Sequence, residues 1–177
     1  MTTLPEHRKS FKRSVSSAKA RKRVRSQIEQ RCLDSESLEF LEDILDPDFS
    51  LMNLRQDMKF WKLMSTDNRF NTAVVETVVD TKSEEKVETF FTMVFMKLQA
   101  KEIFHKCLQK MYNKFIDTMV TENQTLLLES LFKIDFSQWE TADFNPKMKN
   151  LPALVKACMA NNYEVCRILV ANGFLLR

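Results

Sequence analysis

Glycine is almost absent from this chain of 177 residues, in which Gly173 stands alone beside four prolines. Turns with positive φ depend on glycine, so a β fold made of many short hairpins is not expected. The phosphate-binding loops G-x-G-x-x-G and Walker A each need several glycines, and the G-x-S-x-G nucleophile elbow needs two. The scarcity of glycine therefore excludes these enzyme classes.

Histidine and closely spaced cysteines are scarce as well. A metal site built on His105 and Cys107 would need two more ligands in helical register, and none is evident. The remaining histidine, His7, lies far away near the N-terminus. We therefore predict that the chain is not an enzyme and holds no metal or cofactor. The four cysteines show no C-x-x-C spacing, and we interpret them as buried thiols in a reducing compartment: Cys32, Cys107, Cys158 and Cys166.

Long apolar runs are missing too. No stretch reaches the roughly 18 apolar residues that a membrane-spanning helix requires, and the charged N-terminus is unlike a secretory signal. We expect the chain to be cytoplasmic or to lie at the cytosolic face of a membrane protein.

Apolar residues make up 44% of the sequence, with fourteen phenylalanines and ten methionines. Their spacing is helical along most of the chain. This composition predicts an all-α fold with a large aromatic core.

Residues 1–31 are basic and are predicted to form a disordered arm. Such an arm suits contact with anionic lipid or with an acidic protein face, and less so with nucleic acid. Its densest patch comprises Lys19, Arg21, Lys22, Arg23 and Arg25. Phosphorylation of serines that follow basic residues would cancel charge there; the candidates are Ser10, Ser14, Ser16 and Ser26.

Residues 32–134 are predicted to be helical. Residues 32–48 are acidic, and a short amphipathic helix is expected within them, ending before Pro47. Its acidic face is expected to fold back on the basic arm. A second helix is expected over 50–65, followed by a loop over 66–71. The β-branched stretch 72–79 looks strand-like, but it has no partner strand, so we expect a helix or an irregular segment.

The spacing of Thr81 and Glu84 matches a capping box for the next helix. Further helices are expected over 84–98, 101–111, 112–120 and 124–134. Whether this region holds diverged repeats or a separate helical cap is left open. Residues 135–150 are polar with isolated aromatics and are predicted to be a linker.

Two short helical patterns stand back to back over 151–174. Leu154, Val155, Ala157 and Cys158 mark the apolar face of the first, and the second follows Asn161-Asn162. Gly173 sits just past it, where a left-handed helix stop is expected. Two such short helices are too small to bury a face alone and predict one unit of a stack.

This segment resembles an ankyrin repeat. Leu154, Ala157 and Cys158 match the first helix of the family pattern, and Glu164, Val165 and Leu169 match the second. The turn Asn161-Asn162-Tyr163 replaces the usual Gly-His and is similar to the last ankyrin repeat of transient receptor potential (TRP) cation channels, especially the C-type. The resemblance covers 151–174 and implies helical hairpins stacked as a diverged ankyrin-like solenoid.

Three functions follow as expectations. The first is the cytosolic N-terminal ankyrin-type region of a TRP-like, calcium-permeable channel, which would bind proteins or assemble with sister subunits. The second is a free-standing helical-repeat adaptor. The third is a nuclear or nucleic-acid-associated factor acting through the basic arm. Because an apolar end to a stack would be adhesive, we expect that the natural chain continues past Arg177 or that its end binds something.

Overall fold

The computed structural model describes residues 34–98, 105–137, 144–146 and 151–175, but not the side chains of 98, 105–107 and 151. The basic arm 1–31, its lysine and arginine patch and its serines lie outside these residues. The described part is all-α, as predicted, and contains no strand. Its elements are α2 (Ser35–Leu45), the 3-10 helix η1 (Leu51–Gln56), α3 (Met58–Thr66), α4 (Asn68–Asp80), α5 (Glu84–Leu98), α6 (His105–Thr121), α7 (Thr125–Lys133), α8 (Leu151–Met159) and α9 (Tyr163–Ala171).

The acidic helix α2 forms where the sequence predicts it. The Asp34 carboxylate accepts a hydrogen bond from the Ser37 backbone N–H at 2.8 Å, which caps the helix and lowers the pKa of Asp34. At the other end, Lys86 Nζ from α5 donates to the backbone oxygens of Ile44 at 2.7 Å and Asp46 at 2.6 Å. Carbonyls left free at a helix end are thus satisfied by a distant lysine.

The single helix predicted over 50–65 is wrong. Asp57 breaks this stretch, since its carboxylate accepts from the backbone N–H of Lys59 at 2.9 Å and of Phe60 at 3.0 Å. An aspartate placed this way starts a new helix, so η1 ends before it and α3 begins after it. Met58, the first residue of α3, is 59% exposed.

The loop predicted over 66–71 is also wrong. Asp67 caps α4 in the same way, accepting from the backbone N–H of Arg69 at 2.8 Å and of Phe70 at 3.1 Å. The strand-like stretch 72–79 continues this helix. Val74, Val75 and Val78 are fully buried in it, and this burial outweighs their modest helix propensity.

Thr81 does not form the predicted capping box. It is the C-cap residue of α4, and its hydroxyl donates to the Val78 carbonyl at 2.6 Å. Ser83 begins α5 instead, because its hydroxyl accepts from the Lys86 backbone N–H at 3.2 Å. The helices predicted over 101–111 and 112–120 are one continuous helix, α6, within the residues described.

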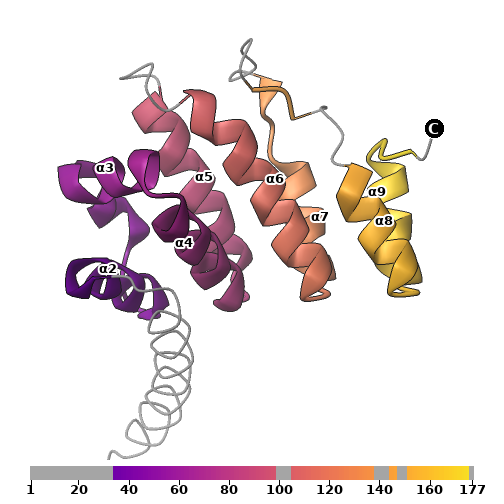
Figure 1. Cartoon of the computed structure of the whole chain (residues 1–177), viewed down its shortest axis with the longest axis horizontal. Coiled ribbons are helices and arrows are strands. Elements are labelled where there is room, and N and C mark those ends of the chain that lie inside the picture. The colour runs from indigo at the N-terminus through magenta and orange to yellow at the C-terminus, as the bar shows by residue number, and fades with distance from the viewer. Residues whose placement is uncertain (1–33, 99–104, 138–143, 147–150, 176–177) are drawn as a thin grey trace, which may run out of the picture.

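Consecutive helices pair into hairpins that lie side by side (Figure 1). Helix α4 pairs with α5, α6 with α7, and α8 with α9. Between hairpins, α4 contacts α6 and α6 contacts α8, while α5 contacts α7 and α7 contacts α9. First helices thus pack on first helices and second helices on second helices, with α2 against α4 and η1 against α5 at the N-terminal side.

A residue with left-handed backbone stands at the turn of each hairpin. Lys82, Asn123 and Asn161 have φ of 54°, 55° and 53°. At Asn161 the amide N–H donates to the Cys158 carbonyl, and the Asn162 N–H donates to the Ala157 carbonyl. These two bonds define a Schellman motif, and the turn at Asn123 has the same pair of bonds.

The predicted stop at Gly173 is confirmed. Its φ is 84°, its N–H donates to the Val170 carbonyl, and the Phe174 N–H donates to the Leu169 carbonyl. Glycine adopts this backbone without a Cβ clash.

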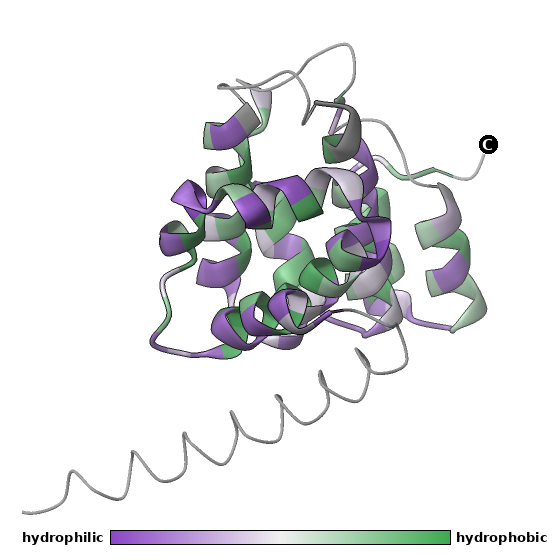
Figure 2. Cartoon of the chain, turned by 60° about the vertical axis from the view of Figure 1, so that its left-hand side comes forward, coloured by the Kyte–Doolittle hydropathy of each residue, from purple (hydrophilic) through white to green (hydrophobic). Residues whose placement is uncertain are grey.

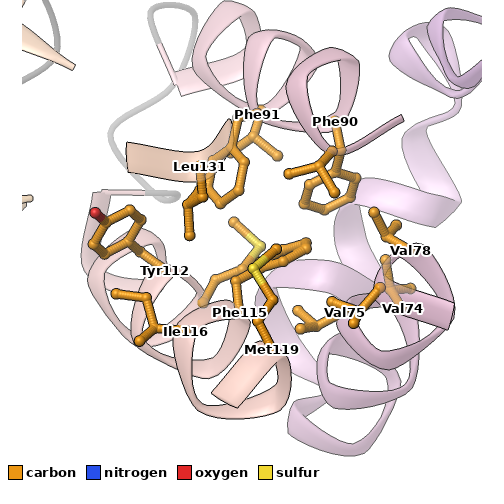
Figure 3. Close-up of a cluster of buried hydrophobic side chains, with 14 of the residues drawn as sticks. Val74, Val75, Val78, Phe90, Phe91, Tyr112, Phe115, Ile116, Met119 and Leu131 are labelled. Atoms are coloured by element: carbon orange, nitrogen blue, oxygen red, sulfur yellow. The ribbon is translucent and has the colours of Figure 1, made fainter. Parts of the chain in front are cut away.

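Apolar side chains from all three hairpins form one buried cluster. Helices turn their apolar sides toward one another and their polar sides outward (Figure 2). At the centre, side chains of α4, α5, α6 and α7 converge (Figure 3): Val74, Val75, Val78, Phe90, Phe91, Tyr112, Phe115, Ile116, Met119 and Leu131.

Aromatic residues from 135–150 also enter the core. Phe136 is 5% exposed and Phe144 is fully buried. Their ring centroids lie 5.3 Å and 5.6 Å from that of Tyr112 on α6. The segment predicted as a linker therefore contributes two anchors to the core, at the distances favoured for edge-to-face aromatic pairs.

Candidate functional site

A polar groove of about 370 Å³ crosses the first helices of the three hairpins. Helices α4, α6 and α8 pack in sequence, so one side of each faces the groove. We call this feature the polar groove; its lining residues are Asn68, Asn71, Thr72, Lys110, Asn113, Lys114, Asp117, Pro152 and Lys156.

Helical periodicity explains why polar side chains gather here. Lys110, Asn113, Lys114 and Asp117 are spaced three or four residues apart on α6, so they share one face of the helix. The opposite face of α6 carries Tyr112, Phe115 and other buried residues. The three residues from α4 and the two from α8 show the same spacing.

The groove is basic overall. Lys156 Nζ lies 2.6 Å from Asp117 Oδ1, with side-chain exposures of 50% and 28%. This ion pair joins α8 to α6 and neutralises the one carboxylate among the lining residues. Lys110 is exposed and Lys114 is half-buried, and neither joins an ion pair among the residues described. Two cations thus remain available to a ligand.

One end of the groove is held by the segment 144–146. The Asn145 N–H donates to Gln109 Oε1 at 2.8 Å, while Gln109 Nε2 donates to Asn113 Oδ1 at 3.0 Å. Since Phe144 beside it is fully buried, this chain of bonds fixes a groove amide relative to the core. The groove is therefore partly preorganised, which reduces the entropy cost of binding.

A smaller hollow of about 200 Å³ lies between α5 and α7. Glu84 and Glu88 line it with Lys133, and the Ser130 hydroxyl donates to the Glu84 carboxylate. Its charges are of both signs, and Glu84 already accepts a hydrogen bond, so this hollow is a weaker candidate for binding.

Most residues that carry the ankyrin resemblance are buried in the core, form turns or cap a helix. Leu154, Ala157, Val165 and Leu169 are buried between helices. Asn161 and Gly173 are the left-handed turn residues. Asn162 begins α9, its side-chain oxygen accepting from the Val165 N–H at 3.2 Å. None of these lines the polar groove.

The other residues of the resemblance are on the surface. Tyr163 is 81% exposed. Glu164 forms an ion pair with Arg167 at 2.6 Å, and this pair lowers the pKa of Glu164. Cys158 is exposed, and Val155, which was also assigned to the apolar face of α8, is 39% exposed.

The prediction of buried thiols is thus wrong for Cys158 and only half right for Cys166, which is partly buried. On α8 the buried stripe is Ala153, Leu154 and Ala157, and Cys158 lies about 100° around the helix from Ala157. The other two cysteine side chains, Cys32 and Cys107, lie outside the description, as do His7 and the side chain of His105.

Within the described ranges, no cluster of three or more histidine, cysteine or acidic side chains is arranged to hold a metal ion. Among the same residues, no helix is both long and apolar enough to cross a bilayer. Comparison with models of known families, with curated proteins and with solved structures found no match.

Sequence reasoning missed the polar groove. The sequence shows that the polar residues of α6 share one face of the helix. It does not show that α4 and α8 lie beside that face and complete a groove. That neighbourhood links residues about 40 positions apart, and the first-helix contacts that create it are visible only in the fold.

Proposed function

We propose that this chain is a protein-interaction module made of stacked, diverged ankyrin-like helical hairpins, and that it binds an acidic segment of a partner protein in the polar groove. The main support for this proposal is the polar groove, which crosses α4, α6 and α8. It presents Lys110 and Lys114 beside three asparagine side chains.

The hairpin arrangement supports the repeat interpretation. Like helices contact like helices from one hairpin to the next, which is how repeat proteins bury a face that a single unit leaves bare. The left-handed turn residues recur about 40 residues apart, longer than the roughly 33-residue ankyrin period. The long helix α6 and the connection between α7 and α8 account for the extra length.

The chemistry of the groove supports an acidic ligand. Lysine ammonium groups attract carboxylates, and asparagine side chains both donate and accept hydrogen bonds. A groove across several helices suits an extended or helical peptide better than a compact small molecule. Electrostatic attraction of this kind contributes mainly to specificity and to the association rate.

The test is the binding of a fluorescent acidic peptide to the full chain, followed by anisotropy. The double variant K110E/K114E should bind far more weakly than the wild type. The control is Lys62→Glu, because Lys62 is an exposed lysine on α3 outside the groove lining. Equal weakening by both variants would indicate a general charge effect, and no weakening by the double variant would contradict the proposal.

The broader setting we propose is the cytosolic N-terminal region of a TRP-like cation channel, with a free-standing adaptor as the alternative. The turn Asn161-Asn162-Tyr163, which resembles the last ankyrin repeat of C-type TRP channels, supports the channel setting. Sequencing the transcript through the codon for Arg177 tests it. A reading frame that continues into spans of about 20 apolar residues is expected, and a stop codon in every transcript would favour the adaptor.

A further inference from the structure

Two cysteine side chains face each other across the last hairpin. Cys158 lies near the end of α8 and Cys166 lies in the first half of α9. Their sulfur atoms are 3.7 Å apart, and both are free thiols. This contact is independent of the polar groove, which neither cysteine lines.

The turn between the helices holds the two thiols in this position. The Schellman bonds at Asn161 end α8, and the Asn162 side chain begins α9. Buried residues on both sides, Ala157 and Val165, fix the helices against each other. A disulfide holds its sulfur atoms about 2.05 Å apart, so the two sulfur atoms, now 3.7 Å apart, must move closer together for the bond to form.

The two thiols differ in their surroundings. Cys158 is exposed and meets dissolved oxidants first. Cys166 is partly buried and packs against the core. Burial raises its pKa, and the neighbouring Cys158 raises it further, so Cys166 is the slower of the two to react with an outside reagent.

We propose that Cys158 and Cys166 form a peroxide-sensitive modification site that closes to a disulfide within the α8–α9 hairpin. The Cys158 thiol loses its proton, and the thiolate attacks hydrogen peroxide as the O–O bond breaks. A sulfenic acid forms, and the hydroxide released takes up that proton to give the first water. The Cys166 sulfur then attacks the Cys158 sulfur. The S–S bond forms as the S–O bond breaks, and the departing hydroxide takes up the Cys166 proton. In total two thiols are oxidised and one peroxide is reduced to two waters.

The bond joins the helices of one hairpin and leaves the other hairpins unmodified. It restrains α9 against α8 at the turn, where Asn162 Nδ2 also contacts Asn123 Oδ1 of the preceding hairpin. Oxidation therefore stiffens the C-terminal hairpin, and a reducing thiol reverses it.

Digestion with trypsin offers a direct test on the full chain. Cleavage after Lys156 and after Arg167 releases one peptide, 157–167, that contains both cysteines. The folded chain is treated with hydrogen peroxide, free thiols are alkylated, and the digest is weighed. We expect this peptide to become two hydrogens lighter and to lose both alkylations, and dithiothreitol should restore them. Oxidation of Met159 in the same peptide adds oxygen and is distinguished by mass.

Single variants test the order of the steps. In Cys166→Ser the reaction should stop at a Cys158 sulfenic acid, which dimedone traps. In Cys158→Ser the Cys166 thiol should remain alkylatable. The chain unfolded in urea should form the internal bond more slowly than the folded chain.

Three results would overturn the proposal. The first is a peptide that keeps two free thiols while Cys158 of the Cys166→Ser variant is oxidised. The second is oxidation of Cys158 beyond the sulfenic acid without an internal bond. The third is a bond from either residue to Cys32 or Cys107 in place of the internal one.

Discussion

Asn162 Nδ2 donates a hydrogen bond to Asn123 Oδ1 at 2.6 Å, and this bond joins the turns of two neighbouring hairpins. Asn123 is the left-handed residue between α6 and α7. Asn162 follows the equivalent residue, Asn161, and caps α9 with its other side-chain atom. One side chain thus both starts a helix and aligns its hairpin with the preceding one.

Replacing Asn162 by alanine should lower the free energy of unfolding by about 1–2 kcal/mol, because a helix cap and an inter-turn hydrogen bond are both lost. Urea unfolding followed by circular dichroism measures the change. Asn162→Ser keeps a capping oxygen but is too short to reach Asn123, so it should cost less than alanine. If serine and alanine cost the same, the cap contributes little and the bond to Asn123 dominates.

Gly173 and Lys82 both have left-handed backbone, but substitutions at the two positions should affect the free energy of unfolding differently. Gly173→Ala places a Cβ at φ 84° and should destabilise the chain by about 1 kcal/mol. Lys82→Gly removes a Cβ at φ 54° and should leave stability unchanged or raise it slightly, since the chain entropy of glycine offsets part of the gain. Thermal unfolding of both variants tests the pair, and a marked loss of stability in Lys82→Gly would show that the lysine side chain has a structural role at the turn.

Phe144→Ala should destabilise the chain by about 3–5 kcal/mol, because a fully buried aromatic ring is removed from the core. Met58→Ala provides the matched control, since Met58 is a large apolar residue that is 59% exposed; its effect should be below about 0.5 kcal/mol. Equilibrium unfolding in urea gives both values. Equal small effects would mean that 144–146 is only loosely attached to the helices.

The Glu164–Arg167 ion pair predicts a dependence of stability on pH. Arg167 lowers the pKa of Glu164 below its ordinary value of 4.5. A carboxyl group whose pKa is lower in the folded state adds stability above its unfolded pKa and loses it as the pH falls through the folded value. Glu164→Gln should therefore have a lower Tm than the wild type at pH 7, and the difference should vanish in acid. Glu88→Gln, an exposed glutamate of α5 outside the ion pairs of the described residues, serves as the control and should show no such trend.

The fold was predictable from sequence where the apolar spacing is regular. The amphipathic pattern within 32–48 located α2, and the pattern around Leu154 and Leu169 located the last hairpin with its stop at Gly173. The predicted helix boundaries were wrong where a single polar side chain determines the start of a helix. Asp57 and Asp67 each begin a helix by accepting backbone hydrogen bonds, but in the sequence they look like ordinary surface or loop residues.

The other features that the sequence did not reveal depend on contacts between residues that are far apart in the chain. Val74, Val75 and Val78 have strand-like character alone, and their helix is stabilised by burial against Phe90 and Phe115 (Figure 3). The partners of Lys86 and the ring contacts of Phe144 are likewise set by residues far away in the sequence. The polar groove depends on the same long-range contacts, so its lysines could be located on one face of α6 without revealing what lies opposite.

The most direct test of the proposed function is to map the contact surface of an acidic peptide by NMR on the isotope-labelled full chain. The largest shifts should fall on α4, α6 and α8, at backbone amides near Asn71, Lys114 and Lys156, and K110E/K114E should remove them. Shifts confined to α5, α7 and α9, or shifts that persist in the double variant, would contradict the polar groove as the binding site.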